Sequence, residues 1–277
     1  TYFTPRKNVI ETADHLRKLG IDETWIHEIV RREILYNQQE FTQRCVEDPD
    51  GTAKELLDGV KAYLPAGYDM THFTPKYRPW QQRIAFVPNG DIFKGIASGK
   101  ASMVTGEIDR FTKNGVRLKS GEELEADIIL TATGFNLCVL GDIDFSIDGS
   151  HIDFSDTVTY RGMMFTGVPN MVWIFGYFRA SWTLRVDLIG DFVCRLLNHM
   201  GKKQVHSVEP VLRPEDKSME LHSWIEPDNF NPNYLMRSMH LLPKRGDKHE
   251  WMHTQDYWLE KDEIPKIDLD DPAFTYR

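Results

Sequence analysis

Asp127-Ile128-Ile129-Leu130-Thr131-Ala132-Thr133-Gly134-Phe135 is the segment that says most about how this chain folds. The near-continuous apolar run from Asp127 to Ala132 predicts a strand buried on both faces, as in a parallel sheet. The run ends in Thr133-Gly134, and small residues let a backbone approach a ligand or a second strand closely. From the residues alone, an ordinary strand end and a ligand-facing loop are equally good interpretations.

Shorter segments on both sides of this run also have the composition of strands. We predict strands at Arg83–Val87, Ser102–Thr105, Glu107–Thr112, Gly115–Leu118, Met163–Thr166 and Met171–Phe175. Lys113-Asn114 indicates the turn of a hairpin between two of them. Pro88-Asn89-Gly90 indicates a turn before a short helix at 91–98.

Residues 1–70 have helical patterns. One helix is expected over about 8–19, and a second is expected to start near Asp22. A third is expected to start at Thr52, which has capping-box spacing to Glu55.

A longer helix is expected later in the chain. Ser181 has the character of an N-cap, and the apolar residues that follow it recur every four positions to about Met200. Residues 201–277 are rich in proline and aromatic residues and indicate an irregular tail.

The composition excludes several classes of protein. The chain has 277 residues, of which 41% are hydrophobic and 27% charged, with a net charge of −9. This globular, acidic composition argues against a nucleic-acid partner. The three cysteines lie far apart without a Cys-x-x-Cys pair, so neither a disulfide framework nor a cysteine metal site is expected. No apolar run reaches the ~18 residues of a membrane span, and we expect a cytoplasmic protein.

No G-x-G-x-x-G and no P-loop occurs in the chain. In a doubly wound domain, the pyrophosphate of a dinucleotide sits on such a glycine-rich turn and on the helix that follows it. Taken alone, this absence counts against dinucleotide binding by these residues.

Several short motifs nevertheless resemble one enzyme family. The segment Asp127–Phe135 resembles the Asp-x-x-x-x-Ala-Thr-Gly segment of class B flavoprotein monooxygenases. Further segments resemble the Baeyer–Villiger branch of that family: Gly67-Tyr68-Asp69, His72-Phe73, Pro79-Trp80-Gln81-Gln82-Arg83, Val87-Pro88-Asn89-Gly90-Asp91, Gly162-Met163-Met164, Gly167-Val168-Pro169-Asn170-Met171 and Ala180-Ser181-Trp182-Thr183-Leu184. The resemblance runs from about residue 1 to 250 and is specific as a set.

This resemblance implies the C-terminal portion of a Rossmann-like, two-domain α/β enzyme that binds FAD and NADPH. Residues 1–130 would complete the NADPH-binding domain, with 1–70 as a helical insertion. Residues 131–277 would complete the FAD-binding domain and add a tail. The family's glycine motifs would lie in a missing N-terminal half of the same enzyme, so we expect this chain alone to be inactive.

The resemblance also implies a reaction. Enzymes of this family use O2 to insert one oxygen atom into a ketone, or oxidise a sulfide or an amine, through a peroxyflavin. The cofactors carry the hydride and oxygen chemistry, and the protein supplies position and charge.

Arg83 is the catalytic residue that the resemblance implies, because family members carry an arginine beside the flavin at the matching place. A guanidinium keeps its charge at working pH. It can therefore stabilise the negative charge on a flavin peroxide and on the tetrahedral adduct of a ketone. By sequence context alone, a surface arginine next to a strand is the better interpretation.

The remaining site residues also follow from the resemblance. The residues expected to bind cofactor are Gln82, Thr133, Gly134, Gly176, Tyr177, Ser181, Trp182 and Thr183. The residues expected to contact substrate are Trp182, Leu184 and Tyr234, the last in a mobile loop over NADP. Physical chemistry supports one of these sites, because the amides and dipole at a helix start suit an electron-rich ring edge.

Two rival functions come from other classes. His249-Glu250-Trp251-Met252-His253 matches H-E-x-x-H, in which two histidines one helical turn apart bind zinc in a hydrolase. The charged turn before it is a poor context for a buried zinc helix, so we expect no metal. A chain without glycine motifs also fits a cofactor-less remnant or an interaction module, which would retain no flavin.

Overall fold

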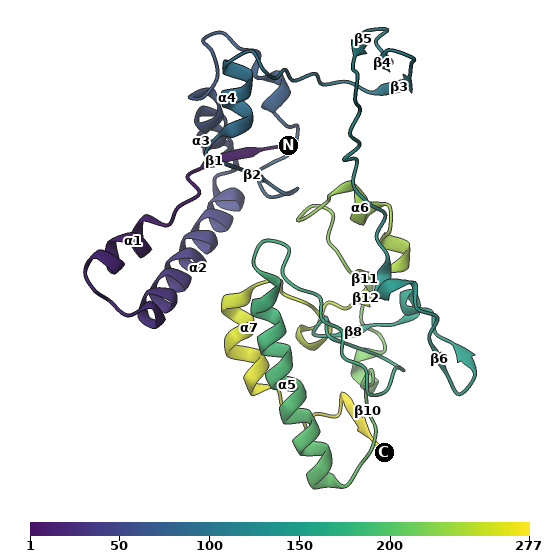
Figure 1. Ribbon diagram of the computed structural model, residues 1–277. Helices are drawn as coiled ribbons and strands as arrows, with labels where there is room; N and C mark the ends of the chain where they lie inside the picture. Colours follow the sequence, from purple (N-terminus) through teal and green to yellow (C-terminus); the bar gives the residue numbers. More distant parts are fainter. The chain divides into compact units, whose positions relative to one another are not determined.

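The computed structural model describes residues 1–277 and consists of two compact units, Thr1–Phe135 and Asn136–Arg277 (Figure 1). The boundary between them lies at the end of the segment that begins at Asp127. The structure is mixed α/β, as predicted. The assignment of 1–130 to an NADPH domain and of 131–277 to an FAD domain stays a prediction.

The first unit begins with a short parallel sheet and helices packed against it. β1 (Phe3–Arg6) pairs with β2 (Ala85–Pro88), which confirms the predicted strand that precedes the Pro88 turn. The helices of this unit are α1 (Glu11–Lys18), α2 (Glu23–Glu47), α3 (Pro49–Lys61) and α4 (Asp91–Ala97). Phe3 joins the sheet to the core, because its ring packs edge-on against Phe73 and Phe93.

α3 begins earlier than predicted. Asp48 is its N-cap and accepts a hydrogen bond from Gly51 N at 3.0 Å, and Pro49 lies in the first turn. Both residues favour a helix start, because Asp accepts from free amides and Pro has the helical φ. Thr52 lies inside the helix, where its hydroxyl donates to Arg44 O at 3.2 Å, so the predicted capping box is wrong.

β3 (Ile108–Phe111), β4 (Gly115–Leu118) and β5 (Glu123–Glu125) form an antiparallel three-stranded sheet. The predicted hairpin around Lys113-Asn114 is confirmed. The strand predicted at 102–105 is wrong, because this mostly exposed segment has no neighbouring strand to share its backbone hydrogen bonds.

The segment that follows β5 is not a strand in this chain. Residues 127–132 pair with no strand, and Ile128 and Leu130 are 79% and 91% exposed. Phe135 is 89% exposed. The prediction of a buried parallel strand is therefore wrong here, because no strand of the chain lies alongside to cover these apolar side chains.

The second unit contains four antiparallel pairs of short strands. They join β6 (Ser146–Ile147) to β7 (Ser150–His151), β8 (Thr159–Tyr160) to β9 (Met164–Phe165), β10 (Val208–Pro210) to β13 (Phe274–Tyr276) and β11 (His222–Ser223) to β12 (Lys244–Arg245). The strand predicted at 163–166 is confirmed as β9. The strand predicted at 171–175 is wrong, because the segment forms no ladder: Trp173 N donates to Met163 O, next to β9, at 2.7 Å, but no further pairing follows.

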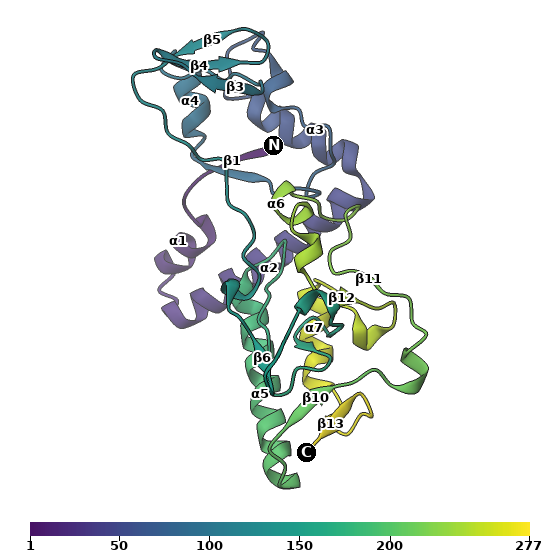
Figure 2. The same cartoon turned by 90° about the vertical axis from the view of Figure 1, so that its right-hand side faces the viewer.

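α5 (Trp182–Lys203) is the long helix of the second unit and confirms the helix predicted after Ser181. α7 (Tyr257–Glu263) packs beside it, and α6 (Asn233–Met236) is a single turn (Figure 2). The buried face of α5 packs in one cluster with Met163, Trp251 and Phe274. The prediction of an irregular tail is therefore wrong in part, because residues after 200 form two helices and four strands and enter the core.

Short 3-10 helices connect these elements, at Met70–Phe73, Val139–Asp142, Phe154–Asp156, Pro214–Asp216, Met239–Leu241, His249–Trp251 and Ile264–Lys266. None of the helices has the length and apolar character needed to cross a membrane. A cytoplasmic location stays a prediction.

Candidate functional site

The predicted site residues between Gly176 and Leu184 lie together at the start of α5. Gly176 is buried, and a side chain at this position would overlap the ring of Trp182. The Trp182 ring therefore packs against the Gly176 backbone and also lies 5.0 Å, centroid to centroid, from the Phe175 ring. Trp182 remains 46% exposed, so one side of its ring is available to a ligand.

The first turn of α5 is not capped by a side chain. Ser181 occupies the N-cap position, as predicted, with an extended backbone at φ −64° and ψ 135°. Its hydroxyl pairs with the Thr183 hydroxyl at 2.8 Å instead of accepting from a helix amide. The start of a 22-residue helix thus combines the positive end of the helix dipole with amides that a ligand can bind.

A buried ion pair lies beneath this site. Arg185 is fully buried, and its Nε donates to Glu260 Oε2 at 2.8 Å. The same carboxylate oxygen accepts from the Tyr177 hydroxyl at 2.7 Å. Burial and the adjacent Glu260 carboxylate both raise the pKa of Tyr177, so its phenol stays protonated and donates.

Arg185 and Glu260 are not among the residues predicted from the sequence. A signal for Arg185 was available, because it falls on the same helical face as Ile189 and Phe192 and interrupts that apolar stripe. A buried arginine needs partners for its charge and its donors. No comparable sequence signal identified Glu260 as the partner.

Leu184 and Tyr234 are also in the second unit, and each lies in a helix, Leu184 in α5 and Tyr234 in α6. Leu184 is 4% exposed and packs in the interior of the unit. Tyr234 lies in α6 and packs, half-buried, against the cluster that contains Phe175 and Phe178. Substrate contact by Leu184 and Tyr234 stays a prediction.

Arg83 and Gln82 lie in the first unit, immediately before β2. The Arg83 side chain is exposed, and its carbonyl accepts a hydrogen bond from the Thr1 hydroxyl at 2.9 Å. Gln82 is half-buried and forms a bridge with Pro79. Arg83 thus presents a permanent cation from a loop whose main chain is bonded at Gln82 and at Arg83 itself.

Thr133 and Gly134 are exposed at the end of the first unit. Gly134 has φ +87°, in the region that favours glycine, and no atom lies within 4 Å of the place a side chain would occupy. The structure therefore does not bring Thr133 and Gly134 against any other predicted site residue within their unit.

The H-E-x-x-H segment does not form a zinc site. His249 lies in a 3-10 helix and faces Glu263, with Nε2 3.0 Å from its carboxylate. His253 lies beyond the helix, is half-buried, and stacks on Trp224 with ring centroids 4.0 Å apart. The two imidazoles have different partners because the chain leaves the helix between them. No group of His, Cys, Asp and Glu side chains in the chain could hold a metal ion.

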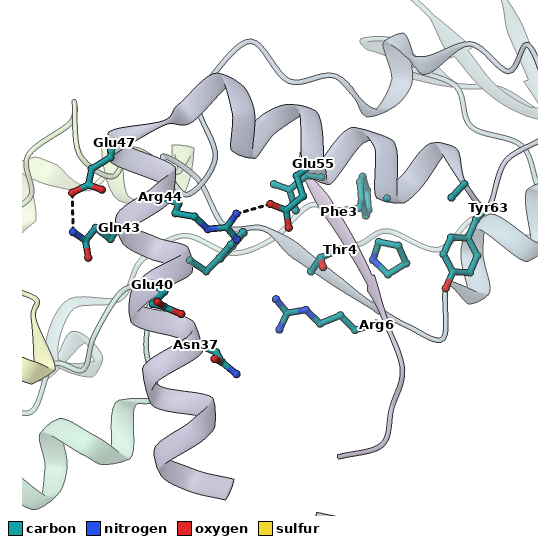
Figure 3. A pocket seen from close by; sticks show the side chains of 15 residues that line it. Phe3, Thr4, Arg6, Asn37, Glu40, Gln43, Arg44, Glu47, Glu55 and Tyr63 are labelled. Atoms are coloured by element: carbon teal, nitrogen blue, oxygen red, sulfur yellow. Dashed lines mark hydrogen bonds and ion pairs between the residues drawn. The ribbon is translucent and has the colours of Figure 1, made fainter. Parts of the chain in front are cut away.

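A separate groove of about 980 Å³ lies in the first unit between β1 and the helices α2 and α3 (Figure 3). Arg44 Nη1 lies 2.6 Å from Glu55 Oε2 in an ion pair, and Gln43 Nε2 donates to Glu47 Oε1 at 2.7 Å. None of the predicted site residues lines this groove.

Comparisons with known proteins add sequence relatives. No protein-family model matches the chain. The chain is 40% identical over 277 residues to the FAD-containing monooxygenase EthA of Mycobacterium tuberculosis, an alignment that covers 100% of this chain and 55% of that protein. It is 43% identical over 230 residues to EthA of Mycolicibacterium smegmatis, covering 82% of this chain and 46% of that protein. The chain thus spans about half the length of the curated relatives it matches.

A comparison of structures agrees with the fold. A steroid monooxygenase, solved in its oxidised form bound to NADP, matches with a TM-score of 0.63 over 82% of this chain and 45% of that chain. The sequence identity in this match is 16%, so the likeness shows a common fold and no more.

Proposed function

Because this chain is related over its whole length to FAD-containing monooxygenases, as its motifs predicted, we propose that it is the C-terminal portion of an FAD-dependent monooxygenase that uses NADPH. In this proposal, residues 1–130 complete a Rossmann-like NADPH domain and carry a helical insertion at 1–70. Residues 131–277 complete the FAD domain and add a tail.

The start of α5 is the observation that carries this proposal. Uncapped amides, the positive helix end and the half-exposed Trp182 ring lie together there, above the closely packed Gly176. Such a surface fits a flavin, whose ring stacks on aromatic side chains and whose electron-rich edge accepts hydrogen bonds from amides. Ser181, Trp182 and Thr183 would hold the cofactor, with Gly176 and Tyr177 behind them. When bound, FAD would supply the redox chemistry, taking electrons from NADPH and passing them to O2.

Arg83 is the catalytic residue of the proposed reaction. Its exposed guanidinium has no ion-pair partner and offers several donors next to the start of β2. It would bind the negative charge that develops on the reacting oxygen atoms during oxygen insertion. Preorganised charge stabilisation of this kind contributes about 3–4 kcal/mol.

The substrate class remains the finer part of the proposal. We propose ketones, with one oxygen atom inserted next to the carbonyl, and keep sulfides and amines as the alternative within the same reaction class. Trp182 is the predicted substrate contact whose exposure supports this role. Gln82, Thr133 and Gly134 would contact the cofactors from the first unit.

The exposed apolar run at 127–132 supports a further partner. Ile128 and Leu130 face solvent although their segment has the pattern of a buried strand. Apolar runs of this kind are normally covered by another segment. We propose that strands of the N-terminal half of the same enzyme cover it.

Sequencing the gene upstream of the Thr1 codon, and producing the complete protein that it encodes, tests this proposal. We expect two G-x-G-x-x-G motifs, each after an apolar strand. The complete protein should retain FAD, visible by its absorbance, and should consume NADPH and O2 while converting a ketone to an ester or lactone. A protein that carries both motifs but retains no FAD would contradict the proposal and favour the cofactor-less remnant.

A further inference from the structure

The segment Phe175–Phe178 crosses the second unit without a strand beside it, yet it is buried. Buried main-chain amides and carbonyls need partners. Two residues from elsewhere in the chain provide them. Phe175 O accepts from Arg185 Nη1 at 2.8 Å, and Gly176 O accepts from Gln255 Nε2 at 3.1 Å.

Gln255 binds this segment as a neighbouring parallel strand would. Besides its bond to Gly176 O, its Oε1 accepts from Phe178 N at 2.7 Å. One amide group thus pairs with the carbonyl of one residue and the N–H two residues later, the pattern of a parallel ladder. Gln255 has φ +55°, a conformation that a non-glycine residue rarely adopts.

Arg185 fixes the other end of the segment. It donates to Phe175 O, and its Nη1 and Nη2 also reach Gly162 O at 3.3 Å and Arg161 O at 2.6 Å. Glu260 balances its charge and also accepts from Thr254, the residue next to Gln255, at 3.1 Å. Arg185, Glu260 and Gln255 therefore act on the segment as one connected network.

The position of this segment sets the position of the Trp182 ring. Gly176 packs directly against that ring, so a shift of the Gly176 backbone moves one wall of the surface at the start of α5. In a β-sheet, main-chain hydrogen bonds from a neighbouring strand would fix such a segment. Here the side chains of Arg185 and Gln255 replace them.

We propose that Gln255, together with the Arg185–Glu260 pair, is a positioning residue that holds Gly176 and Trp182 in the geometry that binds the flavin. This inference rests on the proposed function. Gln255 binds the main chain of Gly176 and Phe178 and acts on the ring through that main chain, so it needs no contact with the cofactor.

The test compares Gln255→Ala with Asn170→Ala in the complete protein. Asn170 is a matched control, because its Nδ2 donates to His206 O at 3.0 Å and its Oδ1 accepts from Val208 N at 3.0 Å. It also has φ +58° and lies in the same unit. Both variants lose one strand-like amide pairing, but only Gln255 binds the segment that carries Gly176.

We expect both variants to lower Tm by similar amounts. Only Gln255→Ala should weaken FAD binding, on the order of tenfold to a hundredfold, since small displacements of positioning groups have effects of that size. It should also raise the share of NADPH consumed without product and change the absorption spectrum of the bound flavin. Gln255→Glu, which keeps the acceptor for Phe178 N but faces Gly176 O with a carboxylate oxygen instead of an amide donor, should not restore FAD affinity at pH 7.

The outcomes separate the inference from the function on which it rests. Parent protein that binds FAD, with equal FAD affinity and coupling in Gln255→Ala and Asn170→Ala, would overturn the inference alone. Parent protein that binds no FAD would overturn the proposed function and the inference with it.

Discussion

Two apolar segments of this chain, Asp127–Ala132 and Met171–Phe178, both lack a neighbouring strand, yet only the second packs into a core. Side chains of Arg185 and Gln255 bind the main chain of the second segment where a strand would otherwise lie. The first segment leaves its apolar side chains in solvent. A buried segment can therefore be completed by side chains of its own chain, whereas a segment without such partners leaves its apolar side chains exposed.

Of the substitutions that test this comparison, the removal of Arg185 should have the largest effect on stability. Arg185→Met leaves the buried Glu260 carboxylate without its counter-charge, which typically costs about 3–5 kcal/mol. We expect the second unit to unfold at much lower urea, as measured by tryptophan fluorescence. Arg195→Met is the matched control, because Arg195 lies on the same helix and also binds a main-chain oxygen, that of Ile264 at 3.0 Å.

The control should cost only about 1–2 kcal/mol, since its bonds are partly exposed. Adding Glu260→Gln to Arg185→Met should recover part of the stability, because it removes the isolated charge. Equal losses of unfolding free energy in Arg185→Met and Arg195→Met would show that the buried Arg185–Glu260 pair contributes no more to stability than the bonds of Arg195.

Arg83 tests the opposite case, an arginine whose side chain is exposed. Arg83→Ala should leave Tm and FAD retention unchanged, because the side chain has no structural partner. It should lower the rate of oxygenation on the order of a hundredfold or more, through the loss of about 3–4 kcal/mol of charge stabilisation. Near-normal turnover of a ketone by the complete Arg83→Ala protein would exclude the catalytic role.

Acid should weaken the contacts that keep the segment Met171–Phe178 in place. His253 precedes the loop of Thr254 and Gln255, and burial lowers its pKa to about 3 from an ordinary 6.5. The unfolded chain therefore binds a proton that the folded chain does not. The stability due to neutral His253 is complete above pH 6.5 and is lost as the pH falls toward 3.

Urea midpoints at pH 7 and pH 5 measure this effect. His253→Gln, which can still donate to Trp224 O but does not titrate, should lose less stability on acidification than the parent chain. A loss of the same size in both chains would assign the acid sensitivity to other groups.

One glycine in each region gives a finer comparison. Gly176→Ala should cost about 1–3 kcal/mol, because the added methyl group overlaps the Trp182 ring in a packed interior. Gly134→Ala should cost about 1 kcal/mol, since it strains a positive φ but meets no neighbouring atom. Thermal unfolding of both variants measures the difference. A larger loss for Gly134→Ala would mean that the exposed segment is packed in solution.

The elements that the sequence predicted correctly are those stabilised by contacts between residues a few positions apart. The helix after Ser181 and the hairpin at Lys113-Asn114 are examples, because an apolar residue at every fourth position and a turn are both local signals. The segments at 127–132 and 171–175 have strand composition, but composition does not say which partner a segment meets. Gln255 could not have been identified, since it acts on Gly176 from 79 residues away and lies in an irregular region.

The smallest expected effect on stability tests the exposed segment itself. Leu130→Lys should change the free energy of unfolding of this chain by no more than about 0.5 kcal/mol, because Leu130 makes little contact within it. Leu221→Lys, at another exposed leucine, serves as the control. In the complete protein the two variants should diverge. Leu130→Lys places a charge where strands of the N-terminal half would bury it, so FAD retention and Tm should fall there and remain unchanged in Leu221→Lys.

If Leu130→Lys proves equally harmless in both proteins, the apolar run is not covered by the N-terminal half. Its strand-like pattern would then need a different partner, and a second copy of this chain would be the first to test, by measuring the molecular mass in solution with and without the substitution. A loss confined to the complete protein has the opposite meaning. It would identify 127–132 as a strand whose neighbours come from outside this chain, in contrast to the segment at 175–178, which this chain completes with its own side chains.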